Sequence, residues 1–218
     1  MLTIEKTVLP SPDQWAIIIE GMRNPKNSWD KMDSELGYYV TDNSLDDVVN
    51  IGEADHKLMM QLANGGAVHA KYRRMIPVFM TINAPFYWWK EFDTYKVGTV
   101  ANSCSTMHKI HSKEFTMDDF SYEHLAKFEM GVLKYLIDCM NWARERFLAT
   151  KDKDFWWQMI QLLPTSYNQK RTVMLNYEVL VNIYNSRKNH KLCEWHTFCD
   201  WIKTLPYSEL ITGGDAGV

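Results

Sequence analysis

The alternation of apolar and polar residues predicts a chain built mainly of helices, with few strands. Residues 2–9 mix apolar and polar side chains and are predicted to form a short strand, and residues 71–82 carry a nearly continuous apolar run, the strongest strand signal. Pro77 interrupts this run, and because proline cannot donate to a sheet we expect an edge position or a bulge there. Apolar residues near helical spacing predict helices over residues 13–22, 54–63, 86–92, 118–148 (one helix or two), 155–163, 169–184 and 194–204.

Two stretches lack such a pattern. Residues 24–54 are polar and turn-rich, and we expect a surface excursion rather than a linker because Gly and Ser are sparse. Residues 96–113 are small, polar and rich in Ser and Thr, which is more typical of a site wall than of a core. Many helices and few strands favour an α+β fold: a single domain over residues 1–218, with a small antiparallel sheet flanked by helices.

Composition narrows the class of protein. Of the 218 residues, 46% are hydrophobic, which is ample for a core, and the net charge of −3 gives no overall electrostatic case for binding nucleic acid. No apolar run of about 18 residues and no secretion signal is visible, so we expect neither a membrane span nor export. The four cysteines form no CxxC pair and no disulfide framework, which favours a soluble protein of the reducing cytoplasm.

One group of potential metal ligands has an unsuitable spacing. His190, Cys193, His196 and Cys199 follow one another at three-residue intervals. On an α-helix such a stripe turns by about 60° per step, so the four side chains cannot converge on one tetrahedral metal ion. We therefore expect a helix face with small buried thiols and partly exposed imidazoles, and no metal site.

A second group could carry thiol chemistry. Cys104 precedes His108 by four residues, and His111 follows. If the segment were helical, the imidazole could activate the thiol as a nucleophile. The alternative is the wall of a pocket with ordinary histidines, because no third residue that would orient the base is evident.

The stretch from Leu163 to Glu194 has an informative order of residues. It contains Leu163-Pro164, Tyr167, Asn176, Asn182 and Arg187, followed by His190 and Glu194. In this order it resembles the C-terminal segment of flavin-dependent thymidylate synthases. That family has a Leu-Pro, a Tyr, an Asn that opens a helix, a second Asn six residues later and an Arg five residues after that. Its His and Glu, four apart, match after a one-residue deletion.

A second match lies upstream. His69, Ala84-Pro85 and the predicted helix over residues 86–92 fall at the spacings of the family's histidine, Ala-Pro and the helix that leads to its signature motif. The resemblance therefore covers about residues 60–200, in order.

The signature motif itself is strongly altered. It aligns with residues 94–107, where only Lys96 and Thr99 are chemically similar to the family's residues. The arginine that helps to hold the nucleotide phosphate is Thr106, and a Gln and another Arg used for that phosphate fall at Glu91 and Ile160. Such changes weaken phosphate binding by roughly 1.5–3 kcal/mol per charged hydrogen bond. Three cations are candidates to compensate: Lys96, Lys109 and Arg171.

The resemblance implies a function and a set of site residues. Family members are homotetramers that bind FAD, take a hydride from NADPH and transfer a one-carbon unit from methylene-tetrahydrofolate to C5 of deoxyuridylate. By similarity, Arg187 would bind the pyrimidine and stabilise charge on it, and Cys104 and Ser105 would face the nucleotide. The implied flavin ligands are His69, Lys96, Asn176 and Asn182.

The resemblance also implies self-association into a homotetramer. Four tryptophans are candidates for an exposed interface: Trp88, Trp89, Trp156 and Trp157. Two alternatives to the synthase remain open. One is a homologue that binds a nucleotide or flavin without synthase activity, and the other is an enzyme that uses Cys104 as a thiol nucleophile.

Overall fold

The computed structural model describes residues 1–41 and 44–213. Two compact units make up the chain. Unit 1 comprises residues 1–5, 81–94 and 101–172, and unit 2 comprises residues 6–80, 95–100 and 173–218, within the described ranges. The single domain over residues 1–218 stays a prediction.

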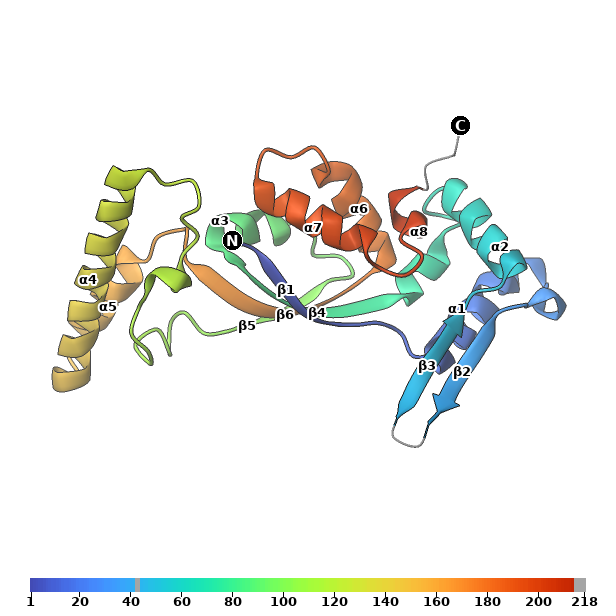
Figure 1. Cartoon of the computed structure of the whole chain (residues 1–218), viewed down its shortest axis with the longest axis horizontal. Coiled ribbons are helices and arrows are strands. Elements are labelled where there is room, and N and C mark those ends of the chain that lie inside the picture. The colour runs from blue at the N-terminus through green and yellow to red at the C-terminus, as the bar shows by residue number, and fades with distance from the viewer. Residues whose placement is uncertain (42–43, 214–218) are drawn as a thin grey trace. The chain divides into compact units, whose positions relative to one another are not determined.

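The expected α+β fold with a small antiparallel sheet is confirmed. Four strands form the main sheet in the order β1-β4-β6-β5 (Figure 1). Their bounds are β1 Thr3–Val8, β4 Pro77–Pro85, β5 Val100–Ser103 and β6 Asn168–Asn176. A separate two-stranded sheet consists of β2 Glu35–Val40 and β3 Leu45–Asn50, which pair antiparallel with Glu35 opposite Asn50.

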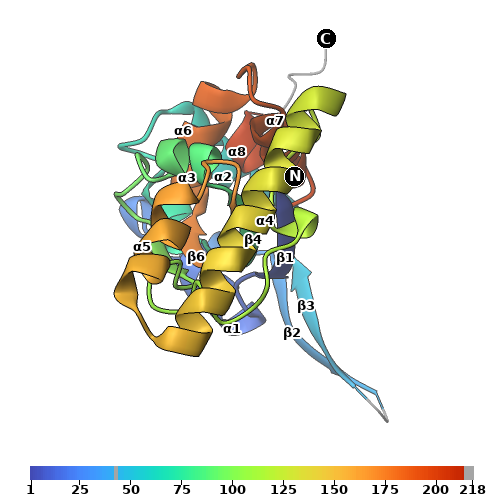
Figure 2. The same cartoon turned by 90° about the vertical axis from the view of Figure 1, so that its left-hand side faces the viewer.

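Unit 1 contains a helical hairpin. Its helices are α3 Phe86–Phe92, α4 Lys127–Thr150 and α5 Lys153–Leu162, with the 3-10 helix η4 over Met117–Asp119. Helices α4 and α5 lie side by side (Figure 2) and are joined through Lys151, whose φ of 61° is left-handed. Their facing sides enclose a core of Ile110, Phe115, Phe120, Leu133, Ile137, Met140, Ala143, Met159 and Tyr167.

Unit 2 contains the remaining helices. They are α1 Pro12–Arg23, α2 Glu53–Asn64, α6 Tyr177–Arg187, α7 Cys193–Lys203 and α8 Glu209–Thr212, with η1 Asn24–Lys26, η2 Trp29–Lys31 and η3 Lys71–Met75.

Two buried ion pairs tie distant segments together. Arg23 Nε donates to Asp55 Oδ1 at 2.5 Å, and Arg73 Nε donates to Glu178 Oε2 at 2.8 Å. Ser34 also donates to Asp55, so this buried carboxylate is well satisfied.

Several sequence expectations are corrected at the strands. The helix predicted over residues 169–184 is a strand up to Asn176 and a helix only from Tyr177. Val173 and Leu175 are two residues apart and share the buried face of β6, and pairing within the sheet overrides the approximate helical spacing of the apolar residues. Pro77 opens β4, an inner strand, so neither an edge position nor a bulge explains it: a first residue tolerates the missing N–H. The segment 24–54 contains the β2–β3 hairpin, and 96–113 contains β5.

Two helical expectations also change. Helix α4 starts at Lys127 with Ala126 as N-cap, whereas Asp119 pairs with Thr116 in a capping box on η4. Leu125 and Phe128, which the helix predicted over residues 118–148 would carry on its apolar face, are exposed. Trp88 and Trp89 were expected at an interface, but both are fully buried, packed edge-to-face at 4.9 Å. Of the other two tryptophans expected at an interface, Trp157 is exposed and Trp156 is half-buried.

Within the described parts of the chain, no helix combines the length and the apolar character needed to cross a bilayer.

Candidate functional site

The candidate residues fall in both units. His69, Lys96, Asn176, Asn182 and Arg187 belong to unit 2, and Cys104 and Ser105 belong to unit 1. The cluster in unit 2 forms around α6 and the loop of residues 95–100, and the segment in unit 1 runs from the end of β5 toward α5.

Arg187 is the last residue of α6 and is half-buried. Its Nε donates to the Tyr95 hydroxyl at 2.9 Å. The guanidinium carbon lies 4.8 Å from the ring centroid of the buried Trp195 and 5.6 Å from that of Tyr95. Two aromatic faces and one hydrogen bond therefore fix the plane of the guanidinium, which is the preorganisation that recognition of a flat polar ligand requires.

Asn176 lies at the other end of α6 and caps it. Its Oδ1 accepts a hydrogen bond from Val179 N at 3.1 Å. Its Nδ2 lies against Gly98, where an added Cβ would come within 3.0 Å of Nδ2 and 3.2 Å of Val179 Cγ2. Gly98 also has a φ of 78°, a left-handed conformation that favours glycine. The loop of residues 95–100 thus follows α6, from Arg187 at its end to Asn176 at its start.

The same loop carries two polar side chains without partners. Lys96 is exposed, and its ammonium group forms neither a hydrogen bond nor an ion pair with any residue in the described ranges. The Thr99 hydroxyl is buried and has no hydrogen-bond partner among the described residues. A buried hydroxyl without a partner costs about 1–3 kcal/mol, so this loop offers a donor that a ligand could satisfy.

The two remaining candidates in unit 2 lie differently. Asn182 is exposed on α6. His69 is exposed in the turn before η3 and lines a cavity of about 350 Å³ together with Met22, Leu62 and Tyr72. The structure therefore brings Arg187, Lys96 and Asn176 to one loop and places His69 at a cavity bounded by α1, α2 and η3.

In unit 1, Cys104 and Ser105 follow β5 in a non-helical segment. Cys104 N donates to Lys170 O at 2.9 Å, and Cys104 O accepts from Gln169 Nε2 at 3.0 Å. Ser105 Oγ accepts from His108 N at 3.0 Å and so shapes the following turn. The helix that would bring His108 to the Cys104 thiol is absent, and no hydrogen bond joins the two side chains, both of which are described.

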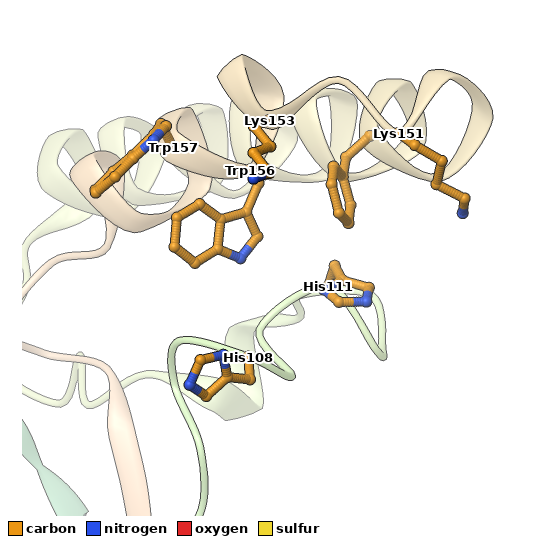
Figure 3. A pocket seen from close by; sticks show the side chains of 7 residues that line it. His108, His111, Lys151, Lys153, Trp156 and Trp157 are labelled. Atoms are coloured by element: carbon orange, nitrogen blue, oxygen red, sulfur yellow. The ribbon is translucent and has the colours of Figure 1, made fainter.

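A pocket of about 440 Å³ lies beyond this turn (Figure 3). It is lined by His108, His111, Phe147, Lys151, Lys153, Trp156 and Trp157, all of unit 1. Sequence reasoning had singled out the histidines and tryptophans separately but had missed the lysines. A usable signal was present, since both lysines closely precede the Trp-Trp pair, Lys151 at the end of α4 and Lys153 as the first residue of α5.

The candidates to replace the lost phosphate ligands are partly engaged elsewhere. Arg171 donates to Asp93 at 2.7 Å and to Gln169 at 2.9 Å, and its guanidinium lies 4.2 Å from the Trp89 ring centroid. Ile160 packs against the core of unit 1. Lys109 is exposed, so it and Lys96 are more open than Arg171.

The histidine and cysteine stripe is engaged in local contacts. His196 Nε2 lies 2.7 Å from His190 O, and Leu192 N donates to His190 Nδ1 at 3.2 Å. Burial raises the pKa of the Cys199 thiol to about 11. No set of three His, Cys, Asp or Glu side chains in residues 1–41 and 44–213 is grouped so as to hold a metal ion.

Comparisons with known proteins find similarity at the level of structure. No protein-family model matches the sequence, and no curated protein matches it. A crystal structure of thymidylate synthase X from Helicobacter pylori with FAD and dUMP has a TM-score of 0.67 at 13% identity, covering 99% of this chain and 98% of that one. A second structure of that flavin-dependent enzyme, also complexed with FAD and dUMP, has a TM-score of 0.63 at 13% identity, covering 98% of each chain.

A third similar structure is a UMP/dUMP methylase, PolB from Streptomyces cacaoi, bound with 5-Br dUMP. Its TM-score is 0.60 at 13% identity, covering 98% of this chain and 95% of that one. The two sheets and their helices therefore have, over nearly the whole chain, the fold of the flavin-dependent thymidylate synthases.

Proposed function

We propose that this chain is an FAD-dependent enzyme that transfers a one-carbon unit from a folate donor to C5 of a pyrimidine deoxynucleotide. The observation that carries the proposal is the arrangement of Arg187, Tyr95 and Asn176 along α6, in a fold whose solved examples hold FAD and dUMP. NADPH as the hydride source and methylene-tetrahydrofolate as the carbon donor are part of the same proposal.

The residues of the 95–100 loop fit an anionic dinucleotide cofactor. Lys96 supplies an unpaired ammonium group, and Thr99 supplies a buried hydroxyl without a partner in the described chain. Gly98 keeps the loop close to Asn176, where a Cβ would force the two apart. FAD bound here would supply the redox chemistry of the reaction. His69 and Asn182 remain proposed flavin ligands from their own positions.

Arg187 is the proposed base-binding residue. A guanidinium whose plane is fixed by Tyr95 and Trp195 presents its N–H donors in a constant direction. Such donors can orient a pyrimidine and stabilise negative charge that develops on a carbonyl oxygen when C5 reacts. By the family resemblance, Cys104 and Ser105 remain proposed nucleotide contacts.

We also propose that the chain forms a homotetramer. Trp88 and Trp89 are buried and therefore do not support self-association. The support comes from exposed apolar residues on one face of α4. Phe128, Val132 and Tyr135 are spaced four and three residues apart and are 78%, 55% and 71% exposed. An apolar stripe of this kind on a long helix favours burial against another protein surface.

Light scattering tests the assembly. We expect a mass near four times the 25.7 kDa chain. Tyr135→Glu should lower the mass by placing a charge in the stripe, whereas Lys134→Glu, on the neighbouring exposed position, is the matched control. A monomer for the unmodified chain would contradict the proposed assembly.

Flavin binding tests the function. We expect FAD fluorescence to change on titration, with a Kd in the micromolar range or weaker, or about −8 kcal/mol or less favourable, because the signature motif is altered. The second measurement is loss of the C5 hydrogen of dUMP when FAD, NADPH and methylene-tetrahydrofolate are present. No flavin binding at high protein concentration would overturn the proposal.

One alternative has its own support. Thr106 and Ile160 stand where two phosphate-binding arginines are expected, and Ile160 is packed against the core. This favours, as second candidate, a protein that binds flavin or a nucleotide without synthase activity. Flavin binding without any loss of the C5 hydrogen would select it.

A further inference from the structure

The pocket beside α5 contains side chains with no role in the proposed chemistry. Figure 3 shows His108 and His111 on one side, facing Lys151, Lys153, Trp156 and Trp157 on the other. Its volume of about 440 Å³ is in the range of small-molecule sites. All of its lining belongs to unit 1, so the pocket is complete within one compact body.

Hydrogen bonds hold both walls of the pocket in place. Trp156 Nε1 donates to Met107 O at 3.0 Å and thereby joins α5 to the facing segment. Arg144 Nε on α4 donates to His111 O at 3.1 Å. The His111 ring packs edge-on against Phe147, with 4.8 Å between centroids. Because these contacts are made within the protein itself, binding would cost little ordering of the walls.

The aromatic walls suit a flat ring. Trp156, Trp157 and Phe147 supply apolar faces, and the indole of Trp156 is fixed by its hydrogen bond to Met107. Planar heteroaromatic rings stack on such faces, as nucleic-acid bases do on the aromatic side chains of the proteins that bind them.

The charged side chains suit a phosphate. Lys151 and Lys153 are exposed, and neither forms an ion pair with a carboxylate in the described ranges. Ammonium groups act as point charges and suit a tetrahedral phosphate, whereas a planar carboxylate is best matched by the arginine fork, which the lining lacks. His111 Nδ1 is buried without a hydrogen-bond partner among the described residues and could gain one from a ligand oxygen.

We propose that this pocket binds a flat aromatic ring that carries a phosphate group, as in a nucleoside monophosphate. Lys151 and Lys153 hold the phosphate, and Trp156 and Trp157 contact the ring. The inference rests on the proposed function only for the choice of a pyrimidine as the ring. The pocket by itself recognises the combination of ring and phosphate.

Calorimetric titration of the full chain tests the inference with dUMP, AMP and deoxyuridine as probes. We expect dUMP to bind at least about tenfold more tightly than deoxyuridine, since charged hydrogen bonds to the phosphate are the difference. The double variant Lys151→Gln and Lys153→Gln should lose this preference. Lys134→Gln, which removes an exposed lysine of α4 outside the pocket, is the matched control and should keep it.

The outcomes separate this inference from the proposed function. An unchanged dUMP Kd in the double variant, an equal loss in Lys134→Gln, or no binding of either nucleotide by the unmodified chain would overturn the pocket assignment. Lysine-dependent binding of dUMP and AMP without FAD uptake would support the pocket and contradict the synthase. Conversion of dUMP by the unmodified chain, together with a dUMP preference over deoxyuridine that the double variant retains, would support the synthase and contradict the pocket.

Discussion

The Arg187 cluster of unit 2 (Tyr95, Asn176, Arg187 and Trp195) and the pocket of unit 1 that contains Lys151 and Lys153 differ in how far their polar side chains are engaged by the protein itself. Arg187 and Asn176 are already used by the protein, one against Tyr95 and Trp195 and the other as a helix cap. Lys151 and Lys153 are exposed, with no ion pair in the described chain. A residue that is proposed to bind a ligand and also makes contacts that stabilise the fold cannot be changed without affecting both. The ammonium groups of Lys151 and Lys153 have no hydrogen-bond partner in the described chain, and Lys151 Nζ lies 5.9 Å from the Phe147 ring centroid.

The largest expected effect comes from Arg187→Ala. Losing a charged donor should weaken pyrimidine binding or turnover by about 2–4 kcal/mol. Because Arg187 also packs on Trp195 and bonds Tyr95, the free energy of unfolding should fall by about 1–2 kcal/mol. Calorimetry and thermal melting measure the two effects separately.

The matching change to Lys sharpens this expectation. Arg187→Lys keeps a cation near the rings but loses the planar fork, so stability should recover more than ligand binding does.

The double glutamine variant of Lys151 and Lys153 should leave the melting temperature unchanged. If Arg187→Ala lowers only the melting temperature while ligand binding persists, Arg187 is structural, and the contrast between the two regions disappears.

Gly98→Ala should have a smaller effect. The new Cβ would meet Asn176 Nδ2 at 3.0 Å, and alanine is strained at a φ of 78°. We expect a loss of about 1–2 kcal/mol in stability, with weaker FAD binding, because the 95–100 loop must move away from α6.

Gly131→Ala is the matched control for that change. Gly131 lies inside α4, where an added Cβ meets nothing within 4 Å. There alanine should stabilise the helix by about 0.5–1 kcal/mol. Equal melting temperatures for Gly98→Ala and Gly131→Ala would show that the 95–100 loop can move without cost. Gly98 would then not be needed for the approach of this loop to α6.

The two regions also differ in how well the sequence predicts them. Helix α3 was predicted with the observed bounds, and α7 was predicted within one residue at each end, because apolar spacing and terminal signals agree there. Residues 169–176 were predicted as part of a helix but belong to β6, since strand pairing depends on partners distant in sequence. The family resemblance was more accurate at this point: it placed Asn176 at the start of a helix, where it is the N-cap.

The contacts of individual side chains were harder to predict. The role of Tyr95 as a partner of Arg187 depends on a loop 92 residues earlier in the chain. Lys151 and Lys153 become pocket residues only because α4 and α5 pack side by side and face the 107–111 segment. Periodicity reports which face of an element is apolar, but it does not report which distant segment that face meets.

The smallest expected effect concerns thiol labelling. Cys104 and Cys193 are exposed, whereas Cys199 is buried with a pKa raised to about 11, so at pH 8 its thiol is almost entirely protonated. A maleimide should modify the two exposed thiols and leave Cys199 unmodified until the protein unfolds. If residues 104–111 lie at a nucleotide site, dUMP should slow labelling of Cys104 severalfold and leave Cys193 as the internal control. Mass spectrometry of the labelled peptides at several times measures both rates. Equal protection of the two thiols would indicate a general tightening of the structure, and no protection of Cys104 at saturating dUMP would remove the 104–111 segment from the nucleotide site.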